Sequence, residues 1–321
     1  MYCGKILVRS QTTPENAAAV ARALVAAEAD GLAGHGLSRL PSYAAQADSG
    51  KVKGDAVPAV QDRAPAVMAI DADHGFAYPA LEMAVKLLPP RARIFGMASA
   101  AIHKSHHCGA MGLVVEQIAE AGYVALMMAN TPQAMAPWGG ARALFGTNPV
   151  AFAAPIPGRP PMVIDMSMSK VARGKIMKAS QDDDGVIPEG WALDADGNPT
   201  TDPKAALDGT MVPMGDAKGA ALAMMIEVMS AAMTSARFSY EASSFFTASG
   251  DPPGTGQFLM VFDPYAFAGN SYSTRMTGLV TEIEDQQGVR LPGARRFAAR
   301  EEARVNGIVV PAPVIEACGA P

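Results

Sequence analysis

Two adjacent histidines open the most chemically informative stretch of the chain, residues 105–149. His106 and His107 precede Cys108-Gly109-Ala110, and the stretch closes on Phe145-Gly146-Thr147-Asn148-Pro149. Imidazole is the side chain whose ordinary pKa suits proton transfer at neutral pH. A histidine beside glycine turns and a polar strand end therefore indicates a proton shuttle next to a ligand crevice. The alternative is a core histidine that caps the following helix.

A metal site is the other chemistry that this cluster could support. His103, His106, His107 and Cys108 are all zinc-ligand types. Neighbouring residues at a strand end point in opposite directions, and no second cluster of ligands follows. We therefore expect no metal.

A carboxylate anchor is indicated near the N-terminus. Gly34-His35-Gly36 is followed by Arg39. Flanking glycines allow the backbone to approach a ligand closely, and a guanidinium can hold a carboxylate through two parallel hydrogen bonds. His35 and Arg39 are thus candidate substrate residues, and the alternative is an ordinary surface loop after the first helix.

Basic residues follow a buried strand in the middle of the chain. The strand ends in Asp165-Met166-Ser167, and Lys170, Arg173, Lys175 and Lys178 come next, with spacings that place several on neighbouring helical faces. This concentration favours a 2'-phosphate, hence NADP(H) over NAD(H). A solvated basic face is the alternative.

A second candidate anion site lies at Lys218, in Gly215-Asp216-Ala217-Lys218-Gly219, ahead of an apolar helix. The helix dipole disfavours a lysine there unless an anion is also bound. A mere surface lysine is the alternative. No predicted strand is followed by GxGxxG, so a Rossmann dinucleotide site is unsupported.

Composition sets broad limits. The 321 residues are 49% hydrophobic and 18% charged, which indicates a globular protein with a large core. A net charge of -5 makes nucleic acid an improbable partner. Cys3, Cys108 and Cys318 form neither a disulfide framework nor a CxxC zinc motif, so we expect the cytoplasm. We identify no secretory or membrane-spanning segment.

The periodicity of apolar residues predicts an α/β fold with a mixed or mostly parallel sheet. Thr13 is the expected N-cap of a helix that begins at Pro14. The Gly/Pro/Asp-rich segment 181–216 is expected to form an excursion over the site. Strands are expected at Ala66–Ile70, Ile94–Ala98, Tyr123–Met128, Val150–Ala154, Met162–Met166 and Phe258–Phe262, and helices at Pro14–Ala29, Ala80–Leu88, Met111–Ala121 and Lys218–Ala236.

Several of these pieces, in this order, resemble one known family. The segments are GHGLSR, HCGAMG, APWGG, FGTNP, IDMS, IPEGWALDADGNPTTDP and GDAKG, within residues 15–310. They are similar to the malate/L-lactate dehydrogenase family that is unrelated to the Rossmann lactate dehydrogenases. That family includes malate, ureidoglycolate and sulfolactate dehydrogenases and the pyrroline- and piperideine-2-carboxylate reductases.

The resemblance implies a three-layer, mixed-sheet, non-Rossmann NAD(P)-binding domain plus a smaller α/β domain built from both chain ends. It places the NAD(P)-binding domain at residues 122–280, and the substrate and dimerisation domain at 1–121 and 281–321. It also implies a homodimer.

The resemblance further implies site roles. His107, in the H-x-G-A pattern, is the expected proton donor and acceptor, and Arg39 the expected carboxylate anchor, assisted by His35. Gly34 stands where many relatives carry Ser or Thr, which leaves a hydroxyl contribution to Ser38. The cofactor-binding residues are expected to be Thr131, Asn148, Asp165, Met166, Ser167, Lys170, Arg173 and Lys218.

The function so implied is hydride transfer between nicotinamide C4 and C2 of a small anionic 2-hydroxy or 2-oxo carboxylate of malate, lactate or sulfolactate type. The alternative is an NADPH-dependent reductase of a cyclic ketimine, for which Phe245 and Phe246 could form an apolar wall. More distant alternatives are a catalytically silent ligand-binding dimer and a zinc hydrolase.

Overall fold

The central element of the computed structural model is a seven-stranded sheet with strand order β1-β2-β3-β10-β4-β5-β6. The structure describes residues 2–182, 184–310 and 312–317. The strands are β1 Ala59–Ala64, β2 Val67–Asp71, β3 Met97–Ser105, β4 Val124–Ala129, β5 Val150–Ile156, β6 Arg159–Met166 and β10 Thr255–Phe262. Strands β2 and β3 are parallel, and the other neighbouring pairs of this sheet are antiparallel. The expectation of a mixed sheet is confirmed. A mostly parallel sheet is wrong, because β10 inserts between β3 and β4 and runs antiparallel to both.

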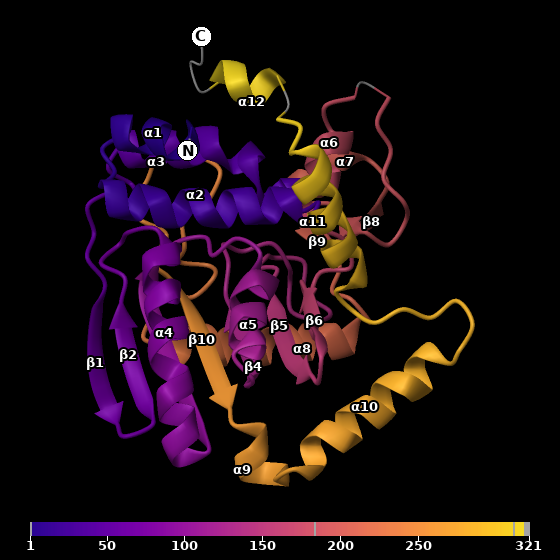
Figure 1. Ribbon diagram of the computed structural model, residues 1–321. Coiled ribbons are helices and arrows are strands. Elements are labelled where there is room, and N and C mark those ends of the chain that lie inside the picture. The colour runs from indigo at the N-terminus through magenta and orange to yellow at the C-terminus, as the bar shows by residue number, and fades with distance from the viewer. Residues whose placement is uncertain (1, 183, 311, 318–321) are drawn as a thin grey trace.

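Helices cover both faces of this sheet (Figure 1). Helices α4 (Ala77–Phe95) and α5 (Met111–Glu120) lie on one face, whereas α8 (Ala217–Glu227) and the π-helical turn Val228–Ala232 lie on the other. The result is three layers, α/β/α. The main core fills the space between α4, α5 and the sheet, and its fully buried members include Leu88, Ile102, Ile118, Met127 and Leu259.

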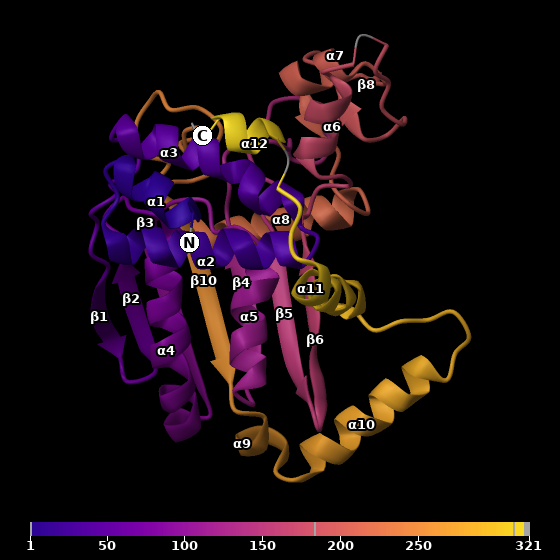
Figure 2. The ribbon, with the colours of Figure 1, turned by 45° about the horizontal axis from the view of Figure 1, so that its top comes forward.

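The N-terminal helices lie across one end of the sheet (Figure 2). They are α1 (Tyr2–Arg9), α2 (Pro14–Ala29) and α3 (Leu40–Asp48), with short 3-10 turns at Ala33–His35 and Leu37–Arg39. The Thr13 hydroxyl accepts a hydrogen bond from the Asn16 amide, so the predicted cap and both predicted ends of α2 are confirmed. These helices share a second apolar core around Leu7, Val20, Leu24, Leu40 and Tyr43.

The segment between β6 and α8 forms a small lobe that projects from the body (Figures 1 and 2). It contains α6 (Arg173–Ala179), α7 (Pro203–Asp208) and the three-stranded sheet β8-β7-β9, with β7 Ala192–Leu193, β8 Pro199–Thr200 and β9 Thr210–Met211. An apolar cluster that includes Ile176, Ile187 and Met211 stabilises it, and the same cluster contains Met128 of β4 and Ile226 of α8. The predicted excursion is therefore folded, and it shares its apolar core with the body of the molecule.

One predicted boundary is wrong. Helix α4 does not end at Leu88 but continues through Pro89 and Pro90 to Phe95, so Ile94–Phe95 is helix and strand β3 begins only at Met97. Ala84, Leu88 and Ala92 are all fully buried at helical spacing. Their continuous packing outweighs the hydrogen bonds that the two prolines remove.

The predicted Lys218–Ala236 helix is also interrupted. Its α-helical part ends at Glu227, and the π-helical turn Val228–Ala232 replaces the rest. The Ser230 hydroxyl donates to the Ile226 carbonyl, and such back-bonding competes with the regular helix ladder.

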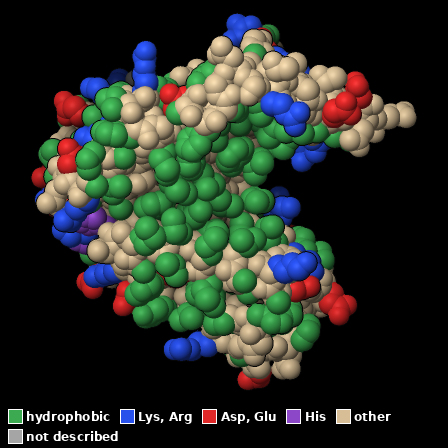
Figure 3. Space-filling model, turned by 90° about the horizontal axis from the view of Figure 1, so that it is seen from below, with side chains coloured by type: hydrophobic (Ala, Val, Ile, Leu, Met, Phe, Trp, Pro, Cys, Tyr) green, Lys and Arg blue, Asp and Glu red, His purple; other side chains and the backbone are tan. Residues whose placement is uncertain are grey.

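The C-terminal part contributes α9 (Pro264–Ala268), α10 (Ser271–Glu284), α11 (Ala294–Asn306) and α12 (Ala312–Ala317). Helix α10 extends away from the body as an arm, and Val280 is its one residue that is buried. Seen from below, hydrophobic side chains occupy the middle of the molecular face (Figure 3). No helix within the described ranges is long and apolar enough to cross a membrane.

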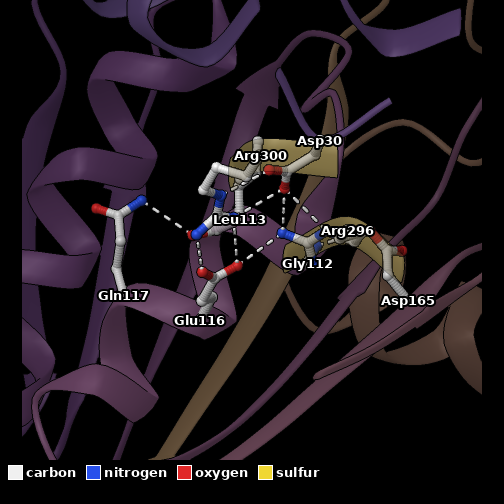
Figure 4. A network of polar contacts seen from close by, with 8 residues as sticks. All are labelled: Asp30, Gly112, Leu113, Glu116, Gln117, Asp165, Arg296 and Arg300. Atoms are coloured by element: carbon white, nitrogen blue, oxygen red, sulfur yellow. Dashed lines mark hydrogen bonds and ion pairs between the residues drawn. The ribbon is translucent and has the colours of Figure 1, made fainter. Parts of the chain in front are cut away.

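Four charged side chains join α11 to the rest of the molecule (Figure 4). Arg296 and Arg300 both bind the carboxylates of Asp30, at the end of α2, and of Glu116, in α5, at 2.5–2.7 Å. Both carboxylates are almost fully buried. These ion pairs hold α2 and α11, which come from the N-terminal and C-terminal parts of the chain, beside α5, the helix that follows His107.

Candidate active site

His107 lies in the turn between β3 and α5 and is 8% exposed. Its Nδ1 is 2.5 Å from the Tyr43 hydroxyl, which in turn lies 3.1 Å from the Tyr78 hydroxyl. Burial raises the pKa of Tyr43 to about 12, so this phenol stays protonated at neutral pH. The bond to Nδ1 orients the ring and leaves Nε2 as the nitrogen for exchange with a ligand.

The fold brings His35 and Arg39 to the same place. The rings of His35 and His107 are stacked, with centroids 5.5 Å apart and planes inclined by 15°. The Arg39 Nε donates to the Gly34 carbonyl at 2.8 Å, which orients the guanidinium. Within the described part of the chain, its two terminal nitrogens make no protein hydrogen bond, so they can bind a carboxylate.

The electrostatics of this cluster keep its imidazoles neutral. Burial first, then Arg39, His35 and His106, hold the pKa of His107 well below its usual value. Burial and then Arg39 lower the pKa of His35 to about 4. An anion bound at Arg39 would offset the cationic field and raise the proton affinity of His107.

Phe245 and Phe246 supply an apolar wall. The Phe245 ring centroid lies 5.2 Å from that of His107. The guanidinium carbon of Arg39 lies 4.7 Å from the centroid of Phe246. The wall therefore touches both the candidate proton shuttle and the candidate anchor.

His106 has a different environment from that of its neighbour. Its Nε2 lies 3.0 Å from Oε1 of Gln46, and the residue is 1% exposed. Burial is the main reason why its pKa falls to about 3. His106 is thus a neutral core residue.

Tyr43 and Tyr78 were not among the sequence-based candidates. Tyr43 follows Arg39 by four residues, and this helical spacing could have placed it on the same side as the anchor. No sequence pattern indicates Tyr78, which reaches Tyr43 from α4.

Thr131 joins two strand-end loops. Its hydroxyl accepts the Thr147 amide at 2.9 Å. A Cβ on Gly146 would lie 2.2 Å from the Thr131 carbonyl oxygen, so only glycine allows this approach. The pair defines the edge of the sheet where β4 ends and β5 begins.

Asn148 precedes Pro149, a position that favours an extended backbone, but its φ is +36°. Its buried amide donates to Glu227 at 2.7 Å and to the Ala223 carbonyl at 2.9 Å. These bonds stabilise a left-handed backbone that asparagine tolerates better than most residues. The amide of Asn148, which was expected to bind the cofactor, is therefore bonded within the protein.

The residues Asp165, Met166 and Ser167 lie at the end of β6. Asp165 accepts the Gly112 amide of the first α5 turn at 2.7 Å. Asp165 is an exposed residue, but the protein around its carboxylate removes part of the water that would solvate the charge. This desolvation raises the pKa of Asp165. Met166 is exposed and Ser167 is half-buried, so this strand end presents accessible groups close to the start of α5.

The predicted basic residues divide between two elements. Helix α6 begins at Arg173, so Lys170 precedes it and does not share a helical face with Lys175 and Lys178 as expected. A Cβ on Gly190 would lie 3.1 Å from Lys170 Nζ, so this ammonium lies next to Gly190 within the lobe. Arg173 is half-buried, and burial lowers its pKa.

Lys218 is the second residue of α8 and is exposed. Its own amide donates to the Gly215 carbonyl. The preceding Asp216 has a φ of +57° and caps no helix amide with its side chain. Among the described residues, no group of three or more His, Cys, Asp or Glu side chains could hold a metal ion.

The chain matches the family model described as malate/L-lactate dehydrogenase over residues 1–318. It is 51% identical to a (2R)-3-sulfolactate dehydrogenase (NADP(+)) from Chromohalobacter salexigens, over 92% of this chain and 88% of that protein. It is 41% identical to a Delta(1)-pyrroline-2-carboxylate/Delta(1)-piperideine-2-carboxylate reductase from Pseudomonas syringae pv. tomato, over 95% of this chain and 89% of that one.

Solved structures agree with the sequence match. The crystal structure of the Pseudomonas syringae delta1-piperideine-2-carboxylate reductase has a TM-score of 0.93 at 39% identity, and covers 99% of this chain and 96% of that chain. The sulfolactate dehydrogenase of Methanocaldococcus jannaschii has a TM-score of 0.90 at 27% identity, over 99% and 92% of the two chains. This mixed-sheet, non-Rossmann fold and the full-length match establish that the chain belongs to the malate/L-lactate dehydrogenase family.

Proposed function

We propose that the protein is an NADP(H)-dependent oxidoreductase that interconverts a small 2-oxo acid and its 2-hydroxy acid, of malate, lactate or sulfolactate type. The names of its relatives support oxidoreductase activity and the NADP preference. The observation that carries the proposal is the stacked pair His35 and His107 next to Arg39.

Each residue of this cluster has a distinct part. Arg39 binds the substrate carboxylate through its free guanidinium nitrogens, with His35 beside it. His107 exchanges a proton with the oxygen on C2 through Nε2, while Tyr43 keeps the ring oriented through Nδ1. Binding of the carboxylate offsets the field of Arg39, so His107 gains proton affinity when substrate is present.

The cofactor is expected along the edge of the sheet where β4 and β6 end. When bound, the nicotinamide supplies or accepts the hydride. Accessible polar groups at this edge fit such a ligand, and Lys170 and Arg173 would pair with a 2'-phosphate. The residues proposed to hold it are Thr131, Asp165, Met166, Ser167, Lys170, Arg173 and Lys218. The Asn148 amide donates to Glu227 and so stabilises the loop that carries Thr147.

A cyclic ketimine reductase is the second candidate. The contacts of Phe245 with His107 and of Phe246 with Arg39 create an apolar surface that suits a ring imine. NADPH oxidation with sulfopyruvate, oxaloacetate, pyruvate and pyrroline-2-carboxylate would separate the two functions. Turnover of the imine alone would favour the second candidate, and no NADPH binding would favour a silent ligand-binding protein.

The role of His107 is tested with His107→Asn. This variant should lose turnover by a factor of about 100 or more, since a positioned acid or base commonly contributes that much. NADPH binding, followed by fluorescence, should stay within about twofold of wild type because the cofactor residues are intact. Near-normal turnover would reject the proton-shuttle role.

We also propose a homodimer in the cytoplasm, with residues 1–121 and 281–321 forming the substrate and dimerisation domain and 122–280 the cofactor domain. The extended arm α10 and the hydrophobic face in Figure 3 favour association. Large hydrophobic side chains are exposed along α8 and the turn after it: Leu222, Met224, Met225, Val228 and Met233. The free thiols of Cys3 and Cys108 favour a reducing compartment, whereas Cys318 lies outside the described residues. Light scattering after size exclusion should give twice the chain mass.

A further inference from the structure

Lys51 is a buried lysine whose ammonium binds only backbone and hydroxyl oxygens. The residue is 3% exposed. Its Nζ donates to the carbonyls of Ser244 at 2.7 Å, Thr247 at 2.9 Å and Ser249 at 2.9 Å. No carboxylate pairs with it among the described residues. A buried ammonium is costly unless its protons are bonded, and three carbonyls satisfy this one.

The segment that these carbonyls belong to, residues 244–249, has no regular secondary structure. Three further donors from the same side hold it, and the first is the Ser42 hydroxyl, which donates to the Phe245 carbonyl at 3.3 Å. Gln46 Nε2 donates to the Phe245 carbonyl at 2.9 Å, and the Ser49 hydroxyl donates to the Ala248 carbonyl at 2.8 Å. The conformation of this loop is therefore set by hydrogen bonds from α3 and the turn after it, with Lys51 as the donor of three.

The same loop carries both rings of the apolar wall. Phe245 lies against His107, and Phe246 lies under the guanidinium of Arg39. Phe246 is 42% exposed, so burial of its ring does not fix it in place. The backbone of the loop must do so, and Lys51 binds the carbonyls on both sides of the two rings, those of Ser244 and Thr247.

We propose that Lys51 is a positioning residue that determines substrate affinity and selectivity by holding loop 244–249 against Arg39 and His107. The inference rests on the proposed function of that cluster. Without the ammonium, three loop carbonyls lose their donor and turn towards water, so the exposed ring of Phe246 is no longer held under Arg39. His107 keeps its bond to Tyr43, so the chemical step is affected less than substrate binding.

The test compares Lys51→Met with Lys53→Met. Lys53 is two residues away, but it is half-exposed and pairs with Asp73 on the surface. Chymotrypsin cuts after Phe245 and Phe246 only if the loop opens, and mass spectrometry identifies the fragments. Cleavage there should be about tenfold faster in Lys51→Met than in wild type, and unchanged in Lys53→Met.

Steady-state kinetics supply the second measurement. In Lys51→Met the KM for the acid or imine should rise about tenfold while kcat falls by less than about threefold. Unchanged cleavage and unchanged KM in a folded Lys51→Met protein would overturn the proposal. If Lys51→Met does not fold, Lys51→Gln keeps one donor group, and the same comparison should give smaller shifts in the same direction.

Chemical rescue separates a donor role from simple packing. Methylammonium added to Lys51→Ala should restore resistance to chymotrypsin and lower KM, whereas tetramethylammonium, which has no N–H, should not. Equal rescue by both cations, or none by either, would contradict the donor role. Proteolysis needs no substrate. Faster cleavage of the variant, without activity of the wild type on any tested acid or imine, would reject the proposed function but still support the role of Lys51 in holding loop 244–249.

Discussion

The Tyr43 hydroxyl lies 2.5 Å from Nδ1 of His107, and both groups are buried. This bond determines which nitrogen of the imidazole can exchange a proton with a ligand, because the other nitrogen is occupied. It also links α3, which follows the proposed anchor Arg39, to the turn that carries the proposed proton shuttle His107. The bond thereby fixes the position of one proposed group relative to the other.

Tyr43→Phe should reduce kcat by about tenfold, because the ring of His107 loses the bond that orients it. The KM for substrate should change by less than about threefold, since Arg39 is not touched. Steady-state kinetics with saturating cofactor measure both. A Tyr78→Phe variant, which removes only the outer hydroxyl of the chain, is the matched control and should retain more activity. Equal losses in the two variants would argue against a direct orienting role.

Arg39→Lys should raise the KM of the carboxylate substrate by about 30-fold or more, with a smaller effect on kcat. Lysine keeps the positive charge but loses the planar pair of donors and the contact with Phe246. The comparison of KM with kcat at fixed NADPH is the measurement. An unchanged KM would show that the carboxylate binds elsewhere.

Acid should destabilise the protein from about pH 6.5 downwards. The pKa of His35 falls to about 4 and that of His106 to about 3, mainly through burial, and the pKa of His107 is also lowered. Below the ordinary histidine pKa the unfolded chain therefore binds more protons than the folded one, so stability decreases as pH falls. Each histidine contributes up to about 1.4 kcal/mol per pH unit.

Urea unfolding between pH 7.5 and 5 measures this dependence, in a range where most carboxylates remain ionised. His106→Gln removes one buried imidazole. The number of protons taken up on unfolding, which sets the slope of the unfolding free energy against pH, should therefore fall by about one. A slope equal to that of wild type would mean that His106 is protonated in the folded state.

Arg296→Met should lower the free energy of unfolding by about 3 kcal/mol, because Asp30 and Glu116 are buried and each loses a partner. Arg304→Met is the control. Arg304 pairs with Glu301 on the surface of the same helix, and its loss should cost far less than that of Arg296, because solvent screens an exposed pair. Urea denaturation of both variants provides the comparison, and similar losses would show that the buried network contributes little.

The sequence alone was sufficient wherever local chemistry decides structure. Thr13 and Pro14 start α2 as predicted, since a cap and a fixed φ act within one turn. The ordered motifs identified the family, which the full-length match confirmed. Local patterns failed at Pro89 and at Asn148, because burial and buried hydrogen bonds outweighed the local preference.

Only the tertiary structure decided which candidates lie together. His106 and His107 are the same residue type and differ in sequence only by the H-x-G-A pattern, yet one bonds to Gln46 in the core and the other to Tyr43 beside Arg39. The wall formed by Phe246 lies about 200 residues from Arg39 along the chain, and Lys51 holds it through carbonyl groups that every residue has. No sequence pattern can report such contacts, because they depend on how distant segments pack and on backbone groups that carry no residue identity.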